Sequence, residues 1–174
     1  MPSYHAPTGA RRAELRALYE AEEPFVRRVV VRLGGPDADV EDLVHDVFEV
    51  ALRRIDSFEG RSAPRTWLYG IAVRVVARWR RRQRLRRFFA LDDAPEPADA
   101  TTPADLFELR EKAELVYRIL DRMADKKRTV FILHEIEGLS GEAIAEVLGC
   151  PLKTVWTRLF HARRAFSRGL EADA

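Results

Sequence analysis

The segment from residue 60 to residue 91 holds the residues of this chain most suited to binding a ligand. It contains ten arginines and no acidic residue, although the net charge of the whole 174-residue chain is only +2. The arginines are Arg61, Arg65, Arg74, Arg78, Arg80, Arg81, Arg82, Arg84, Arg86 and Arg87. A field of one sign over one surface attracts phosphate at long range, so the segment predicts a polyanionic partner. A solvated basic surface without a partner is the alternative.

Five aromatic residues are interleaved with these arginines. They are Trp67, Tyr69, Trp79, Phe88 and Phe89. Aromatic rings beside arginines suit unstacked bases, because a base can stack on a ring while its phosphate meets a cation. Trp67 and Tyr69 also fit a protein core, and for Trp67 the core is the preferred prediction.

A second candidate site lies near the C-terminus, where a tight turn, Gly149-Cys150-Pro151, separates two predicted helices. Ser140 is a suitable N-cap and Gly149 a suitable C-terminal residue for the first of them. Apolar residues recur at helical spacing on both sides of the turn, at Ile144, Ala145, Leu148, Val155, Leu159 and Ala162. This pattern predicts a helix-turn-helix, although similar helix pairs occur in proteins that bind no DNA.

The outer face of the last helix strengthens that prediction. Its polar residues are Lys153, Thr154, Thr157, Arg158, His161, Arg164 and Arg168. Cations and small hydroxyls on such a face can reach phosphates and base edges.

A third group of polar residues is acidic and lies on the predicted helix that ends near Ile55. Its members are Glu41, Asp42, His45, Asp46 and Glu49. The helix dipole explains acids in the first turn, but Asp46 and Glu49 lie beyond it.

No pattern in the chain predicts an enzyme, a metal site or a cofactor. The four histidines lie on separate elements, and His45 with Glu49 supplies fewer ligands than zinc normally needs. The sequence has no glycine-rich phosphate loop, no Gly-x-Ser-x-Gly motif and no Cys-His dyad. The single cysteine, Cys150, excludes an intrachain disulfide; a redox switch is conceivable there, but a semi-buried thiol is the better prediction.

The elements that carry these sites are all predicted to be α-helices, because apolar residues recur at three-and-four spacing and no segment alternates as a strand would. The expected helices cover residues 13–33, 39–55, 66–86, 105–122 and 126–137, a short one from Ser140, and a longer one to about Leu170. Residues 92–104 hold three prolines and four acids but no large apolar residue, which predicts a linker. With 47% apolar residues, both halves can form a core. No apolar run is long enough for a membrane span or a signal peptide, so we expect a soluble, cytoplasmic protein.

Three motifs in this order resemble the extracytoplasmic-function (ECF) sigma factors of bacteria. They are DADVEDLVHDVF at residues 37–48, RTWLYGIA at residues 65–72, and EGLSGEAIAEVLGCPLKTVWTRL at residues 137–159. The resemblance covers roughly residues 12–170. It implies a sigma-2 domain at 11–91, a linker at 92–104 and a sigma-4 domain at 105–174. We expect residues 1–10 to be disordered.

The resemblance also implies a role for each site. The residues expected to dock on the clamp helices of the largest subunit of core RNA polymerase are Asp42, His45, Asp46 and Glu49. Those expected to bind and melt the −10 element are Phe58, Arg61, Arg65, Arg74, Arg78, Arg80, Arg81 and Arg82. Those expected to read the −35 element are Lys153, Thr154, Trp156, Thr157, Arg158, His161 and Arg164. The other expected partners are the flap of the second-largest subunit, promoter DNA and an anti-sigma factor, which could hold the chain at the membrane.

The chain departs from the family pattern at several of these positions. Arg74 and Arg78 stand where the family often has Asn and Asp, and Trp156 and His161 replace usual basic residues of the recognition helix. The promoter sequence therefore does not follow from the family. Trp156 could pack on a thymine methyl, touch polymerase or cover the core.

Two other functions fit parts of the sequence. A stand-alone helix-turn-helix regulator would bind palindromic duplex DNA as a dimer, but would not need the arginines of the first half. A helical metalloenzyme would have to use His45, Asp46 and Glu49. Promoter elements two helical turns apart are separated by roughly 70 Å, whereas thirteen linker residues span at most roughly 45 Å. A scaffold must therefore set the spacing of the domains, and the resemblance implies that this scaffold is polymerase. In the free chain, the domains are expected either to pack together or to be held by an anti-sigma factor.

Overall fold

The chain folds into helices throughout the part that the structure, a computed structural model, describes: residues 9–58, 60, 62–89 and 104–173. The α-helices in these ranges are α1 Gly9–Gly34, α2 Val40–Arg54, α3 Pro64–Phe89, α4 Ala104–Asp121, α5 Asp125–Phe131, α6 Gly141–Leu148 and α7 Leu152–Asp173. A 3-10 turn, Ile55–Ser57, follows α2, and a π-helical turn, Ile132–Ile136, follows α5. Because no strand occurs in the described ranges, the all-α prediction is confirmed.

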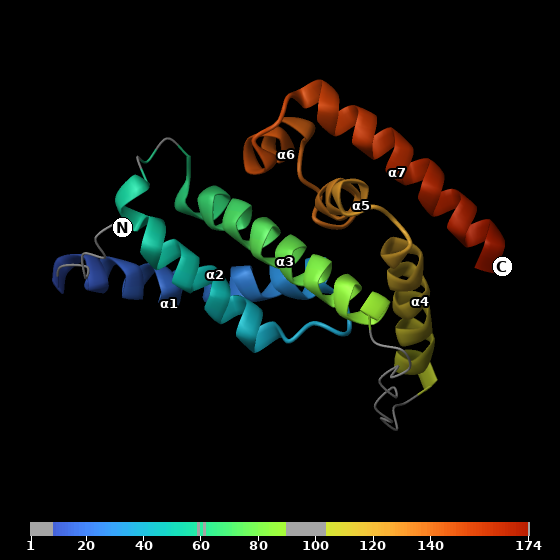
Figure 1. The fold of residues 1–174 in the computed structure, drawn as a ribbon, viewed down its shortest axis with the longest axis horizontal. Helices are drawn as coiled ribbons and strands as arrows, with labels where there is room; N and C mark the ends of the chain where they lie inside the picture. Colours follow the sequence, from blue (N-terminus) through green and yellow to red (C-terminus); the bar gives the residue numbers. More distant parts are fainter. Residues whose placement is uncertain (1–8, 59, 61, 90–103, 174) are drawn as a thin grey trace.

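Helices α1, α2 and α3 pack on one another and form what we call the first helical group (Figure 1). Each presents a stripe of apolar residues at helical spacing, which is the pattern that buries one face of a helix. The buried side chains include Val26, Val30 and Leu33 of α1, Leu43, Val47 and Ala51 of α2, and Leu68, Ile71 and Val75 of α3. The polar faces of α2 and α3 are thereby turned outward.

Helices α4 to α7 form the second helical group, in which α7 packs along α4, α5 and α6 (Figure 1). Its buried residues include Ile119, Leu120, Val130, Leu133, Ile144, Val155 and Leu159. Gly149 ends α6 in the left-handed conformation, with φ of 62°, and Ser140 accepts a hydrogen bond from the backbone N–H of Ala143. Both helix-end predictions for α6 are therefore confirmed.

The two helical groups pack directly against each other, which the sequence left open. Helix α3 lies against α6, and their backbones approach closely at Gly70. A Cβ atom added to Gly70 would lie 3.2 Å from the carbonyl oxygen of Val147. Elsewhere in this contact, the Arg32 guanidinium of α1 donates to the Glu137 carboxylate at 2.5 Å. Apolar packing and charged pairs thus both join the groups.

Two helix boundaries differ from those expected. Helix α1 begins at Gly9, within the segment expected to be disordered, and residues 1–8 lie outside the described ranges. The helix predicted at 126–137 is α-helical only to Phe131, because the π-helical turn widens its last part. There the N–H of Glu137 bonds to the carbonyl of Ile132, five residues back. Apolar spacing does not reveal such a turn, because it depends on which carbonyl each N–H reaches.

Candidate nucleic-acid interface

Helix α3 displays most of its predicted DNA-binding arginines to solvent. Arg74, Arg78, Arg81 and Arg82 are exposed, while the opposite side of the helix is buried in the first helical group. The Arg74 guanidinium also donates to the carbonyl of Gly70 at 3.0 Å. The helix therefore forms a cationic surface of the kind that binds phosphates without regard to sequence.

The start of α3 is tied to α1. Arg65 is exposed, but its Nε donates to Glu22 at 2.8 Å and its guanidinium lies 4.9 Å from the centre of the Phe25 ring. Both contacts orient this arginine at the edge of the surface. Arg61, which was also predicted to bind DNA, lies outside the described residues.

Phe58 and Trp67 contact each other across the loop that precedes α3. Phe58 is partly buried, and its ring centre lies 5.0 Å from that of Trp67. Trp67 itself is partly buried against the core, as expected, and Tyr69 is buried. The contact with Trp67 thus holds the Phe58 ring against the start of α3.

The helix-turn-helix of α6 and α7 presents its predicted recognition face to solvent. Val155, Leu159 and Ala162 are buried and hold α7 in place. The exposed residues of the predicted −35 set are Lys153, Trp156, Thr157, His161 and Arg164, and the partly buried ones are Thr154 and Arg158. Two of them make local contacts: the Thr157 hydroxyl donates to the carbonyl of Lys153 at 2.9 Å, and Arg158 lies 3.8 Å from the sulfur of Cys150.

Trp156 combines a covering role with an exposed edge. It packs edge-on against His134, with ring centres 5.7 Å apart, and it leaves no room for a side chain at Gly141. Its side chain nevertheless remains 44% exposed. One part of the indole thus joins α7 to α6, while the rest is available to a partner.

The acidic face of α2 lies opposite its buried stripe. Asp42, His45 and Glu49 are exposed and Asp46 is partly buried. Glu49 forms an ion pair with Arg53 one turn later, at 2.6 Å. Near the start of the helix, Glu41 binds the Arg27 guanidinium, and this hydrogen bond lowers the pKa of the Glu41 carboxyl.

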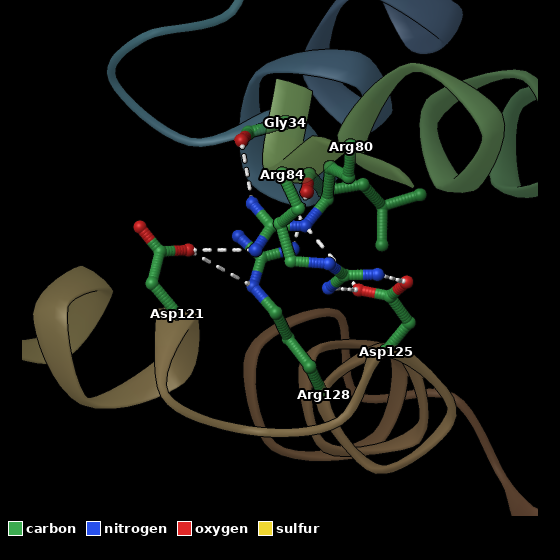
Figure 2. A network of polar contacts seen from close by, with 7 residues as sticks. Gly34, Arg80, Arg84, Asp121, Asp125 and Arg128 are labelled. Carbon is green, nitrogen blue, oxygen red and sulfur yellow. Dashed lines mark hydrogen bonds and ion pairs between the residues drawn. The ribbon is translucent and has the colours of Figure 1, made fainter. Parts of the chain in front are cut away.

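Four charged residues lie close together where the two helical groups touch (Figure 2). The sequence did not identify them as a cluster. They are Arg84 of α3, Asp121 of α4, and Asp125 and Arg128 of α5. With them lies Arg80, one of the predicted DNA-binding residues, whose side chain is only 12% exposed. Its Nη2 donates to Asp121 at 2.8 Å and its Nη1 to the carbonyl of Gly34 at 3.2 Å. In this arrangement Arg80 is therefore not open to DNA.

Within the described ranges, no three histidine, cysteine or acidic side chains are grouped so that they could hold a metal ion. The same ranges contain no helix long and apolar enough to cross a membrane.

The second helical group exposes the predicted recognition face of α7, and the first exposes the arginine-rich face of α3, an arrangement expected of a helical DNA-binding protein. Residues 18–86 match the family described as sigma-70 region 2, and residues 113–166 match sigma-70 region 4. The ECF RNA polymerase sigma-E factor of Escherichia coli K12 is 34% identical over 145 residues, which cover 78% of this chain and 76% of the relative. The chain therefore belongs to the ECF sigma factors. It is an alternative RNA polymerase sigma factor that directs transcription initiation.

Solved structures show the same fold. CnrH, in complex with the cytosolic domain of CnrY, superposes with a TM-score of 0.63 and 28% identity, covering 96% of this chain and 93% of that one. The sigma factor RpoE of Bartonella quintana, in complex with the anti-sigma factor NepR, has a TM-score of 0.61 and 25% identity, covering 92% and 99% of the two chains. Membership of this family favours a polymerase sigma factor over the stand-alone regulator.

Proposed function

We propose that this chain is the promoter-specificity subunit that brings core RNA polymerase to DNA through three separate surfaces. The exposed recognition face of α7 is the observation that carries the proposal, because its cations and hydroxyls can reach both phosphates and base edges. On this face Lys153, Thr157, His161 and Arg164 read the −35 element. Sigma factors are generally not enzymes, and we propose that this chain catalyses no covalent step.

The first helical group binds the −10 element. Arg74, Arg78, Arg81 and Arg82 hold the phosphates of the melted strand on the exposed side of α3. Extruding a base costs a few kcal/mol, and stacking together with charge must supply this energy. The division of the chain is then 11–91 for the sigma-2 domain, 92–104 for the linker and 105–174 for the sigma-4 domain.

Core polymerase docks on the acidic face of α2, where exposed Asp42, His45 and Glu49 surround the partly buried Asp46. Such a face is complementary to a basic groove, which favours fast and specific association. CnrH and the Bartonella RpoE were each solved in complex with a partner, CnrY and NepR respectively. We propose that this chain too is cytoplasmic and is held by an anti-sigma factor.

The test is whether the purified chain comigrates with sigma-free core polymerase. Charge reversal at Asp46 and Glu49, as Asp46→Lys with Glu49→Lys, should weaken core binding about tenfold or more, because like charges then face the partner. A matched control is Glu111→Lys with Glu114→Lys, since these two acids have the same three-residue spacing and are exposed on α4.

Core binding that is lost only in the α2 variant, with helicity unchanged, supports this docking surface. Equal binding by the α2 variant, the control and the original chain removes the assignment of that surface. Failure of the original chain to bind core at all contradicts the proposed function.

A further inference from the structure

Two arginines of the DNA-binding helix are already occupied by carboxylates of the second helical group. Arg84 donates two N–H groups to the two carboxylate oxygens of Asp125, and Arg80 donates to Asp121 at 2.8 Å (Figure 2). Arg80 also lies 3.7 Å from Asp125. A carboxylate that accepts two parallel N–H groups uses the same guanidinium geometry that binds a phosphate. The pair of Arg84 with Asp125 has this geometry, and Arg80 makes a single hydrogen bond to Asp121.

The occupation is confined to one part of α3. Arg74, Arg78, Arg81 and Arg82 are exposed on the same helix. The recognition face of α7 is also exposed, so closure of the two groups does not cover the −35 surface. The contact covers Arg80, whose side chain is 12% exposed, whereas Arg84 is paired with Asp125 but remains 45% exposed.

The contact contains a feature that opposes permanent closure. Arg128 extends from α5 into the first helical group, where its Nη1 donates to the carbonyl of Leu33 and its side chain is 2% exposed. Among the residues that the structure describes, its Nε and Nη2 find no hydrogen-bond partner. The nearest carboxylate oxygen, of Asp121, lies 3.6 Å from Nε. A buried cation with unmet donors is unfavourable, and opening the contact returns it to water.

We propose that Asp121 and Asp125 hold the free chain closed by occupying Arg80 and Arg84, and that nucleic-acid phosphates compete with these carboxylates for the same two arginines. The contact between the two helical groups is observed in the structure and does not depend on the proposed function. Its consequence for DNA rests on the proposed function of α3. In the open chain Arg80 and Arg84 join the exposed arginines of α3 in binding the strand.

Closure is tested first, on the full chain without polymerase. The variant Asp121→Asn with Asp125→Asn keeps the side-chain shape but weakens both pairs. The control Glu111→Gln with Glu114→Gln makes the same change in net charge at exposed positions of α4. We expect a larger radius of gyration by X-ray scattering, and faster hydrogen exchange in residues 70–84, only in the aspartate variant. If the variant stays as compact and as protected as the control, the proposal is wrong.

Competition is tested next by fluorescence anisotropy with a mixed-sequence single-stranded DNA 20-mer. Release of two arginines should raise the affinity of the aspartate variant above that of the charge-matched control, and should steepen its dependence on log salt by about 1.4. Adding Arg80→Gln and Arg84→Gln should abolish that gain. An opened variant that binds the 20-mer no better than the control overturns the competition.

The two proposals can fail separately. A chain that opens and gains affinity for the 20-mer, but does not bind core polymerase, contradicts the sigma-factor proposal and leaves the closed contact standing. A chain that binds core polymerase but does not open in the aspartate variant supports the sigma-factor proposal. That result contradicts the proposal that Asp121 and Asp125 hold the free chain closed.

Discussion

Replacing Arg128 with methionine should stabilise the closed chain, although it removes a hydrogen-bonded arginine. Burial, aided by the nearby charge of Arg80, lowers the pKa of the Arg128 guanidinium from its ordinary value to about 10. At about 1.4 kcal/mol per pKa unit, the charged form is disfavoured by about 3 kcal/mol relative to water. Arg128→Met also removes the hydrogen bond to the Leu33 carbonyl, and this loss costs about 2 kcal/mol. The net expected gain is about 1 kcal/mol.

The assay is urea unfolding of the full chain, followed by circular dichroism. Methionine is unbranched and adapts to irregular space, so Arg128→Met should leave little strain. The matched control is Arg122→Met, because Arg122 is 60% exposed and pairs with Asp173 at 3.2 Å on the surface. An exposed pair of this kind contributes about 0–1 kcal/mol. Arg122→Met should therefore lower the free energy of unfolding by at most about 1 kcal/mol.

A loss of more than about 1 kcal/mol in Arg128→Met, with the control nearly unchanged, would refute this reasoning. It would mean that the Leu33 carbonyl and the nearby carboxylates more than compensate for the burial of the charge. The contact would then be a permanent part of the core, and the argument that Arg128 opposes closure would fail with it.

Two further predictions concern the ends of helices and the response to acid. Gly149→Ala should lower the free energy of unfolding by about 1 kcal/mol, because φ of 62° is strained for a residue with a Cβ, while no atom lies within 4 Å to clash. An unchanged urea midpoint would contradict the left-handed cap. Burial raises the pKa of Asp125, but hydrogen bonds from Arg84 and nearby positive charge outweigh it and leave the pKa lowered. Its stabilisation of the closed chain is therefore full above the ordinary Asp pKa of about 4 and is lost as the pH falls through the lowered value. Hydrogen exchange in residues 70–84 should accelerate over that acid range in the original chain but not in Asp125→Asn.

Local patterns were sufficient for the existence of the helices and for the cap at Ser140, although not for every helix boundary. The apolar stripe of α2 is buried at Leu43, Val47 and Ala51, and the predicted cap at Ser140 forms with the backbone of Ala143. These features depend on residues within one or two turns of each other, so spacing along the chain predicts them. The π-helical turn after α5 escaped prediction because it is a shift in hydrogen-bond partner and has no apolar signature.

The sequence predicted which residues make up the candidate surfaces. It predicted less well whether those surfaces are exposed to solvent. The arginine block identified α3 as cationic, and the polar residues of α7 predicted a face that contacts DNA. Spacing on a helix shows which side chains share a face, but not whether another part of the chain covers it. Arg80 illustrates the difference, because it lies on the basic helix as expected, but its side chain is covered where it pairs with Asp121.

The sequence by itself determined that this chain is helical, that it carries a basic helix and a helix-turn-helix, and that it belongs with the ECF sigma factors. Only the tertiary structure decided which charges meet. Arg84 and Asp125 are 41 residues apart, and nothing in either segment specifies the other. Such pairs form because the packing of α3 on α6 brings the two helical groups together. Their geometry is a property of the whole fold, since charge attracts any opposite charge and selects no particular partner.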